Sequence, residues 1–170
     1  MKTNFSFRML FAGLLLFGFL SCTNAQEPAI TKLHSNEQIA QMLAAFQGSP
    51  SRDVTPSAAL QRQLLADFPK ARDIEWETDG KIFEAEFEVA FADYKAFYDA
   101  EGNLVMFSVD ISRSQVPAEV KNAVKTEFPR HRIEDATRIV QGTETFYKVE
   151  LERGEIEIKA TFKADGTFVR

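Results

Sequence analysis

Few side chains in this 170-residue sequence have the type and spacing that catalysis needs. Cys22 is its only cysteine, and His34 and His131 are its only histidines. A lone histidine just past the end of a helix, as we expect for His131, is usually a capping or surface residue. The sequence has no Ser/His/Asp arrangement with supporting context, no glycine-rich phosphate loop and no Cys/His metal spacing. We therefore expect a protein that is not an enzyme, with no catalytic residue and no cofactor.

Acidic side chains offer a second kind of chemistry. Glu84, Glu86 and Glu88 recur at every second residue, and Glu155 and Glu157 do the same. Carboxylates that share one strand face could hold calcium, which prefers oxygen ligands. A sheet with one buried face shows the same alternation to water, and we favour that interpretation. We predict no metal site and keep a calcium or small-ligand carrier as the alternative function.

Aromatic residues offer a third possibility, the binding of a protein or peptide. Most of the 16 phenylalanines fall at expected inward positions, whereas Trp76, Tyr94, Phe97 and Phe146 do not. Exposed aromatic side chains are typical interface anchors, so these four residues form our candidate binding face. The alternative is that they pack under an N-terminal helix or between the two halves of the chain.

Residues 1–21 have the pattern of a secretory signal peptide. Lys2 and Arg8 supply basic charge, and residues 9–20 are apolar but too short to span a bilayer. The stretch Phe19–Cys22 resembles a lipobox, which predicts a lipoprotein with its lipid attached to Cys22. The alternative is cleavage after Ala25, which gives a soluble periplasmic protein. In both cases we expect an exported protein, and any contact with the membrane should come from the lipid on Cys22 alone.

Charge and cysteine content narrow the choice of partner. Without the two bases of residues 1–21, the chain has 18 basic and 25 acidic residues, a net charge of −7. Such a chain lacks the basic stripe that nucleic-acid binding requires. With one cysteine it cannot form an internal disulfide, so the fold depends on packing. We expect a protein or peptide partner and no nucleic acid.

A short helix should precede the main fold. Within the tether and linker of residues 22–54, Ser35 and Gln38 fit a capping box. Apolar residues follow at helical spacing, and Gly48 then stops the pattern. This predicts a helix over residues 35–47.

The remaining sequence indicates two similar units, residues 55–112 and 113–170. Each begins with a helix whose apolar residues recur every four positions and which ends at a Phe-Pro pair. We expect the first helix to begin at Thr55 and Pro56 and the second to begin at Pro117. The residues that correspond at an offset of 60 are Leu60 and Val120, Leu64 and Val124, Phe68 and Phe128, and Pro69 and Pro129.

Strands follow the helix in each unit. In residues 81–91 the apolar side chains alternate with glutamates, which predicts one buried and one wet face. Further strands are expected near residues 74–76, 93–98 and 104–111, with a turn between the last two. In the second unit the strands should lie near residues 138–140, 147–151, 156–162 and 167–170. In the strand of residues 81–91, the inward residues should be Phe83, Ala85, Phe87, Val89 and Phe91.

These features together resemble a known family. The segments VPAEV at 116–120 and FYDAEGNLV at 97–105, the two Phe-Pro stops and Trp76 are similar to PepSY-like exported proteins described as β-lactamase-inhibitor-like. The resemblance covers about residues 55–170. It implies an α+β fold of two tandem helix-plus-antiparallel-meander repeats, preceded here by the extra helix. It also implies a cell-envelope location and no catalysis.

The expected function follows from both lines of reasoning. We expect a non-catalytic module of the cell envelope that presents a β-sheet face to a protein or peptide partner. Its most specific form, by analogy with the family, is an inhibitor of an envelope hydrolase or peptidase.

Overall fold

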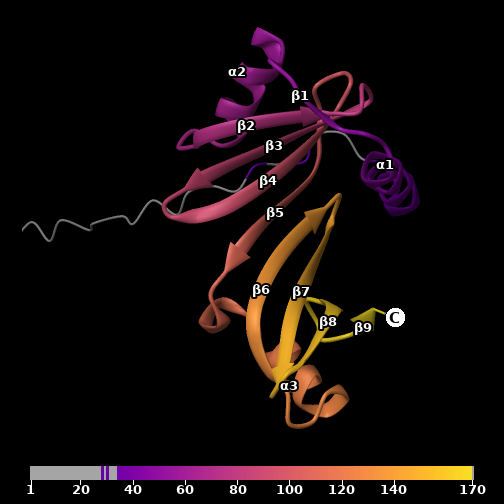
Figure 1. Cartoon of the computed structure of the whole chain (residues 1–170), viewed down its shortest axis with the longest axis vertical. Coiled ribbons are helices and arrows are strands. Elements are labelled where there is room, and N and C mark those ends of the chain that lie inside the picture. The colour runs from indigo at the N-terminus through magenta and orange to yellow at the C-terminus, as the bar shows by residue number, and fades with distance from the viewer. Residues whose placement is uncertain (1–27, 29, 31–33, 170) are drawn as a thin grey trace, which may run out of the picture.

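The computed structural model describes residues 28, 30 and 34–169, and these form helices packed on one β-sheet (Figure 1). The signal peptide, Cys22 and the alternative cleavage at Ala25 lie outside the described residues. Among the described residues, no helix has the length and apolar character needed to cross a membrane.

Three α-helices and a short 3₁₀-helix accompany nine strands in the described part of the chain. The helices are α1 (Asn36–Gly48), α2 (Ala58–Asp67), the 3₁₀-helix (Arg113–Gln115) and α3 (Ala118–Glu127). The strands are β1 (Arg52–Asp53), β2 (Arg72–Thr78), β3 (Ile82–Val89), β4 (Ala92–Asp99), β5 (Leu104–Ile111), β6 (Arg132–Gln141), β7 (Glu144–Arg153), β8 (Ile156–Lys163) and β9 (Phe168–Val169).

All nine strands form one antiparallel sheet in chain order, so each strand pairs with its neighbours in sequence. A helix followed by four strands occurs twice, as α2 with β2–β5 and as α3 with β6–β9. The two sets join where β5 pairs with β6, from Met106 opposite Gln141 to Ile111 opposite Ala136. Figure 1 shows α2 and α3 at opposite ends of the molecule and α1 beside the sheet. The predicted combination of helices with antiparallel strands is confirmed.

The helix ends follow local sequence signals, with one correction. The capping box of Ser35 and Gln38 is present at the start of α1, as predicted. The start of α2 was predicted at Thr55 and Pro56, but its N-cap is Ser57, whose side chain accepts a hydrogen bond from the Leu60 N–H at 3.2 Å. A serine hydroxyl satisfies a free N–H of the first turn, which neither Thr55 nor Pro56 does here.

The two Phe-Pro pairs end their helices in the same way. The Phe68 N–H donates to the Leu64 carbonyl at 2.7 Å, and the Phe128 N–H donates to the Val124 carbonyl at 2.9 Å. Each phenylalanine then leaves helical geometry, with ψ of 78° and 65° respectively. The following proline disfavours helical geometry at the residue before it, which explains both stops.

Two sequence expectations about strands are wrong in extent. Strand β6 was expected near residues 138–140 but begins at Arg132, and β2 was expected near 74–76 but begins at Arg72. Both arginines lie opposite a glutamate on the next strand, and each guanidinium nitrogen lies 2.7 Å from a carboxylate oxygen of Glu88 or Glu152. Charged residues are uncommon in strands, so the composition of these two segments does not indicate a strand start. Only their pairing with the next strand reveals it.

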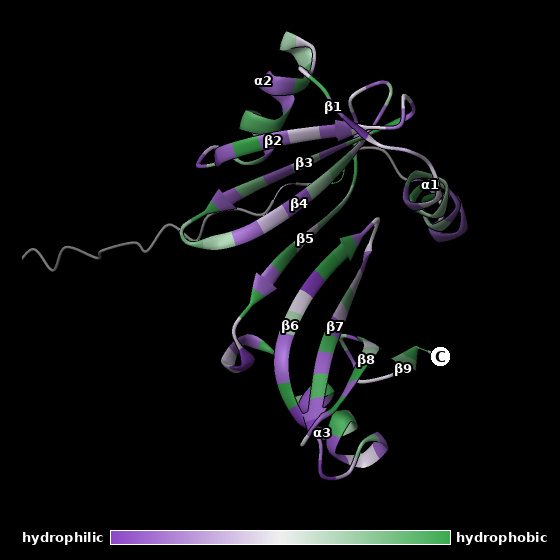
Figure 2. Cartoon of the chain, viewed as in Figure 1, coloured by the Kyte–Doolittle hydropathy of each residue, from purple (hydrophilic) through white to green (hydrophobic). Residues whose placement is uncertain are grey.

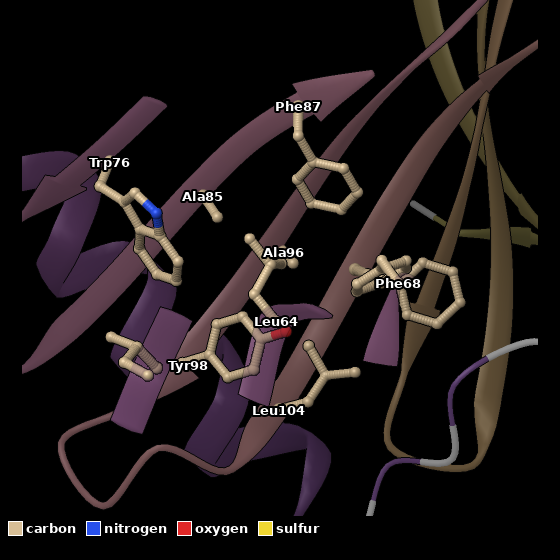
Figure 3. Close-up of a cluster of buried hydrophobic side chains, with 10 residues drawn as sticks. Leu64, Phe68, Trp76, Ala85, Phe87, Ala96, Tyr98 and Leu104 are labelled. Atoms are coloured by element: carbon tan, nitrogen blue, oxygen red, sulfur yellow. The ribbon is translucent and has the colours of Figure 1, made fainter. Parts of the chain in front are cut away.

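The main core lies between the sheet and α2. Cross-strand neighbours share a side of the sheet, and Trp76, Ala85, Ala96 and Phe107 form one such row across β2–β5. Figure 3 shows several of these side chains together with Leu64 of α2. A second cluster, built in the same way under α3, includes Val120, Val124, Tyr147, Val149 and Phe162.

A third cluster lies on the opposite side of the sheet, under α1. Ile39 and Phe46 of α1 pack on Ile82, Phe97 and Val105, and all five are buried. The strand β5 is therefore covered on both sides at its start, and Leu104–Phe107 are four consecutive buried residues. Alternation along this strand predicts only every second residue as buried, because it does not reveal that α1 covers the other side.

Phe91 was predicted to be an inward strand residue, and this is wrong. Val89 lies opposite Ala92, so Ala90 and Phe91 form a two-residue hairpin turn, and Phe91 is 91% exposed. Both turn residues have positive φ, 52° and 66°. This is the type I′ pattern, which Asn-Gly favours and which strains residues with a Cβ.

The double substitution Ala90→Asn with Phe91→Gly should therefore stabilise the fold. We expect a gain of about 1 kcal/mol in the free energy of unfolding, because relief of left-handed strain exceeds the loss of one exposed cation–π contact. That contact places the Arg72 guanidinium carbon 5.8 Å from the centre of the Phe91 ring. Urea denaturation of both proteins measures the difference. A double variant less stable than the wild type would contradict the strain argument.

A hydrogen bond ties α2 to the sheet, and burial of the carboxylate that accepts it makes stability depend on pH. The Tyr98 hydroxyl donates to the Asp67 carboxylate at 3.1 Å, and the Gln63 amide donates to the same group. Burial raises the pKa of Asp67 above its ordinary value, although these hydrogen bonds oppose the shift. Burial also raises the pKa of Tyr98. The protonated form of Asp67 is thus favoured in the folded state.

We expect acidification to favour the wild type over Asp67→Asn. An acid whose pKa is higher when folded contributes stability that is complete below its unfolded pKa and is lost as pH rises through its folded pKa. The unfolding free energy of the wild type minus that of the variant should therefore increase as pH falls from neutral through the raised pKa. Paired urea titrations at several pH values measure it. A difference that shrinks on acidification would contradict the assigned direction.

Candidate functional site

The side of the sheet that α2 and α3 leave uncovered contains a hollow of about 640 Å³. Side chains alternate along a strand, so the neighbours of the core residues Ala85, Ala96 and Phe107 face this opposite side. Figure 2 shows the alternation as changes between hydrophilic and hydrophobic colour along β4 and β6. Strands β2–β7 all contribute to the lining, and the C-terminal residues of α1 bound it.

Most charged residues that line the hollow are acidic. They comprise seven carboxylates and two lysines, a formal charge of 2 − 7 = −5. The acids are Asp73, Glu75, Glu84, Glu86, Glu88, Asp93 and Asp110, and the bases are Lys95 and Lys148.

Strand register concentrates these acids. Glu75 lies opposite Glu86, and Glu77 lies opposite Glu84. Like charges directly opposite one another on a sheet are destabilising, so this arrangement costs folding free energy. Lys95 of β4 offsets part of the repulsion, because its ammonium group donates hydrogen bonds to both Glu84, at 3.2 Å, and Glu86. Of the other acids, Glu88 pairs with Arg72 of β2, at 2.7 Å, and Asp110 accepts a hydrogen bond from the Thr137 hydroxyl, at 2.9 Å.

Glu84 is the most enclosed acid of the hollow, with 8% of its surface exposed. Burial raises its pKa, and the charge and hydrogen bond of Lys95 oppose that shift. Burial would lower the pKa of Lys95, but its bonds to Glu86 and Glu84 outweigh this and raise it. Glu84 and Lys95 thus form an ion pair at the floor of the hollow.

One end of the hollow is apolar. Phe97, Met106 and Ile139 line it from the sheet, and Phe46 of α1 completes it. The rings of Phe46 and Phe97 meet edge to face, with centroids 6.1 Å apart. The site thus combines an acidic floor with an apolar end, an arrangement that suits an amphipathic ligand.

The structure does not bring the four aromatic candidates together. Trp76 is 8% exposed in the core under α2, and Tyr94 is half-buried on the same side, stacked on Phe87. Phe97 is buried under α1, the alternative considered for it from sequence. Phe146 is half-buried on the other side of the sheet, 6.0 Å from the Lys163 ammonium group. Phase along one strand could not show which helix would cover each residue. The four do not make one surface, and of them only Tyr94 and Phe97 line the hollow.

The two histidines have separate structural settings. The His34 Nε2 lies 3.2 Å from an Asp99 carboxylate oxygen, where it joins the start of α1 to the turn after β4. The His131 ring stands edge-on to Phe128, with centroids 6.2 Å apart. Among the described residues, no group of three or more His, Cys, Asp or Glu side chains could hold a metal ion.

Sequence reasoning identified the acids of β3 and two aromatic residues of the hollow, Tyr94 and Phe97, but missed several others. Asp93, Asp110 and Lys148 were not singled out, although each falls on the polar phase of its own strand. Their convergence depends on pairing between strands that are distant in sequence. Complete assignment of strand register would have been needed to find it.

The fold is that of β-lactamase-inhibitor-like (BLIP-like) proteins. A BLIP-like protein from Bacteroides fragilis NCTC 9343 is 22% identical, with a TM-score of 0.60 over 69% of this chain and 85% of its own. A DUF2874 family protein from Bacteroides uniformis ATCC 8492 is 22% identical, with a TM-score of 0.62 over 68% and 88%. A third structure, from Bacteroides eggerthii DSM 20697 and described as "putative periplasmic proteins", is 20% identical, with a TM-score of 0.62 over 69% and 88%.

The family is defined by sequence. Residues 81–170, more than half of the chain, match the family model described as "Putative beta-lactamase-inhibitor-like, PepSY-like". The chain therefore belongs to the PepSY-like family, which confirms the resemblance found in the sequence. No curated protein matches the chain.

Proposed function

We propose that this protein is a non-catalytic binding module of the cell envelope and that the acidic hollow is its binding face for a protein or peptide. The observation that carries the proposal is the uncovered side of the sheet, with a formal charge of −5 over a volume of about 640 Å³. Like-charge pairs such as Glu75 with Glu86 cost stability, and retaining them is reasonable where a ligand supplies the opposite charge. The family match supports this class of function.

Capture experiments with two charge-matched variants test the binding face. Asp93→Lys with Asp110→Lys alters two exposed acids of the hollow, whereas Glu155→Lys with Glu157→Lys makes the same charge change on exposed residues outside it. Envelope extract of the source organism is passed over each immobilised processed protein. We expect wild type and the second variant to retain the same partner and the first variant to lose it. Equal capture by all three would contradict the assignment of the hollow.

An inhibitory role is the more specific form of this proposal. It draws on the β-lactamase-inhibitor-like description of the family and on the BLIP-like name of one solved structure. Envelope hydrolases and peptidases assayed with micromolar protein should lose activity if the proposal is correct. Full enzyme activity at that concentration would contradict the inhibitory role but not the proposed binding.

We propose an envelope location with a lipid on Cys22. The basic and apolar pattern of residues 1–21 supports export, and a structure with the same fold is described as periplasmic. Labelling of cells with a fatty-acid analogue should mark the wild type and leave Cys22→Ser unmarked and out of the membrane fraction. Cleavage after Ala25 instead predicts an unlabelled protein in both cases.

We also propose that the two helix-and-strand units are copies of one ancestral unit. Equivalent details support this: Gly102 and Gly166 have φ of 83° and 86° and donate equivalent turn hydrogen bonds, at 2.9 and 3.0 Å. The Arg72–Glu88 and Arg132–Glu152 ion pairs follow the two helices in the same way. Superposition of residues 55–112 on 113–170 should align the helix and all four strands, and failure to do so would remove the proposal.

A calcium carrier is the competing candidate, because seven carboxylates line the hollow, although no three acids of the described residues are placed to hold one metal ion. Lys95 already neutralises part of Glu84 and Glu86, which weakens this candidate. Calcium that binds the folded state must raise the melting temperature. Thermal melting without and with millimolar calcium therefore tests the calcium-carrier alternative. An unchanged melting temperature would reject it.

A further inference from the structure

The outer edge of β2 is only partly covered by another strand. Strand β1 pairs with β2 at Glu77 and Thr78 alone, and the Val54 N–H adds one bond to the Trp76 carbonyl, at 3.0 Å. Within the described part of the chain, no strand pairs with the outer side of β2 before these residues, at 72–75, a stretch that contains a β-bulge between Arg72 and Glu75. An uncovered strand edge presents N–H and C=O groups that can pair with another extended chain.

A groove of about 660 Å³ runs between this edge and α2. Its apolar lining includes Leu64 and Leu65 of α2, Ile74 and Trp76 of β2, and Val54. Leu65 is 47% exposed, which makes it one of the four large hydrophobic residues exposed among the described residues. The groove thus places an accessible apolar wall beside an unpaired strand edge, the arrangement by which some domains bind peptides as an extra strand.

The charge of the groove is of one sign. Its charged lining residues are Asp53, Glu75, Glu77 and Glu86, and none of its lining residues is basic. Glu75 and Glu77 alternate with Ile74 and Trp76 along β2, so acids and apolar residues face opposite sides of the sheet. A strand added beside β2 would set one side chain toward the acids and the next toward α2.

The opposite edge of the sheet, at β8, differs from the β2 edge in its charge and in the residue that corresponds to Leu65. On β8, strand β9 covers Thr161 and Phe162, and the exposed remainder carries charges of both signs, at Glu157 and Lys159. At the offset of 60 that aligns the two helices, Leu65 corresponds to Lys125. The groove at the β2 edge thus has only acids among its charged lining residues, although Arg72, which pairs with Glu88, lies on the same uncovered stretch.

We propose that the β2 edge binds an extended segment of a partner protein, with alternating basic and apolar residues, as an additional antiparallel or parallel strand. The basic side chains face Glu75, because β1 already lies opposite Glu77, and the apolar side chains pack on Leu65 and Ile74. The groove and the hollow share Glu75 and Glu86, but Asp53 and Glu77 line only the groove, and Asp93 lines only the hollow. The inference does not depend on the function proposed for the hollow.

The test uses the processed full-length protein and a fluorescent six-residue peptide of alternating valine and lysine. Fluorescence anisotropy at physiological salt measures its dissociation constant. A second peptide has proline in place of the central valine, which removes a backbone N–H while keeping the charge. Since a strand pairs through its backbone, we expect the proline peptide to bind at least about tenfold more weakly. Equal binding of both peptides would reduce the interaction to charge attraction and overturn the proposal.

Two variants with the same charge change localise the site. Leu65 and Ile156 are each 47% exposed, Leu65 in the groove and Ile156 on the opposite edge. Leu65→Lys should weaken the valine–lysine peptide at least about tenfold, through loss of an apolar contact and repulsion of the lysines, whereas Ile156→Lys should change it by less than about twofold. Equal effects, or no binding at millimolar peptide, would overturn the proposal. Hydrogen exchange should show new protection in β2, and protection confined to other strands would also overturn it.

Discussion

Phe68→Ala should lower the free energy of unfolding by about 3–5 kcal/mol, the range for truncation of a buried phenylalanine. Phe68 is 5% exposed at the end of α2. Its ring centroid lies 4.8 Å from that of Phe87, 5.6 Å from Phe107 and 5.8 Å from Tyr94. Removal of the ring would leave a cavity at the point where α2 meets three strands. Urea denaturation with a common slope measures the loss.

Two other phenylalanines provide the comparison for Phe68. Phe91 is 91% exposed, so Phe91→Ala should change the unfolding free energy by no more than about 0.5 kcal/mol. Phe128, the equivalent of Phe68 in the second unit, is half-buried and contacts Phe168 and Phe162, with centroids 5.4 and 6.4 Å away. Its truncation should have an intermediate effect. A Phe68→Ala loss no larger than that of Phe91→Ala would contradict the packing described here.

Gly166→Ala should be clearly more destabilising than Gly102→Ala, although the two glycines have nearly the same backbone conformation. Their φ values are 86° and 83°, so each alanine would carry a left-handed strain of about 1–2 kcal/mol. A Cβ at Gly166 would lie 2.8 Å from the Glu119 carbonyl oxygen and 3.1 Å from its carbon, whereas the nearest atom to a Cβ at Gly102 is the Leu60 Cδ1, at 3.9 Å. Only Gly166→Ala therefore requires the backbone of α3 to move.

We expect the clash to add about 1–3 kcal/mol to the loss at Gly166, in the range for overpacked sites. Equilibrium unfolding gives the free energy of unfolding of each variant relative to the wild type. Left-handed strain lowers it in both variants, whereas the contact of a Cβ with Glu119 lowers it only in Gly166→Ala. Equal losses would show that the turn after β8 and the first turn of α3 are not in the contact described.

Local signals in the sequence predicted those parts of the fold that local interactions determine. The capping box at Ser35 and the helix stops at Phe68 and Phe128 depend on residues within one or two turns, and all three are confirmed. The turn between Asp99 and Leu104 was likewise predicted from its own residues. In each case the interacting groups are near neighbours in the chain.

Pairing between distant segments determined the parts that the sequence did not predict. The inward position expected for Phe91 came from extending the alternation of β3 two residues beyond Val89. Those residues, Ala90 and Phe91, form a turn that lacks the usual glycine or asparagine. The burial of Phe97 depends on α1, about 50 residues earlier in the chain, which covers the second side of the sheet. The hollow depends on register, since Glu75 must lie opposite Glu86 for the acids to converge.

The order of the sheet has a consequence for how the molecule forms. Every strand pairs only with its neighbours in sequence, and each α-helix of the two units is adjacent to the strands it covers. Such a topology has short loops to close, and short loops favour rapid folding for a protein rich in strands. A polypeptide that becomes available for folding from its N-terminus could add one strand at a time to the growing sheet. Assembly need not wait for the C-terminal residues, whose arrival completes the last edge.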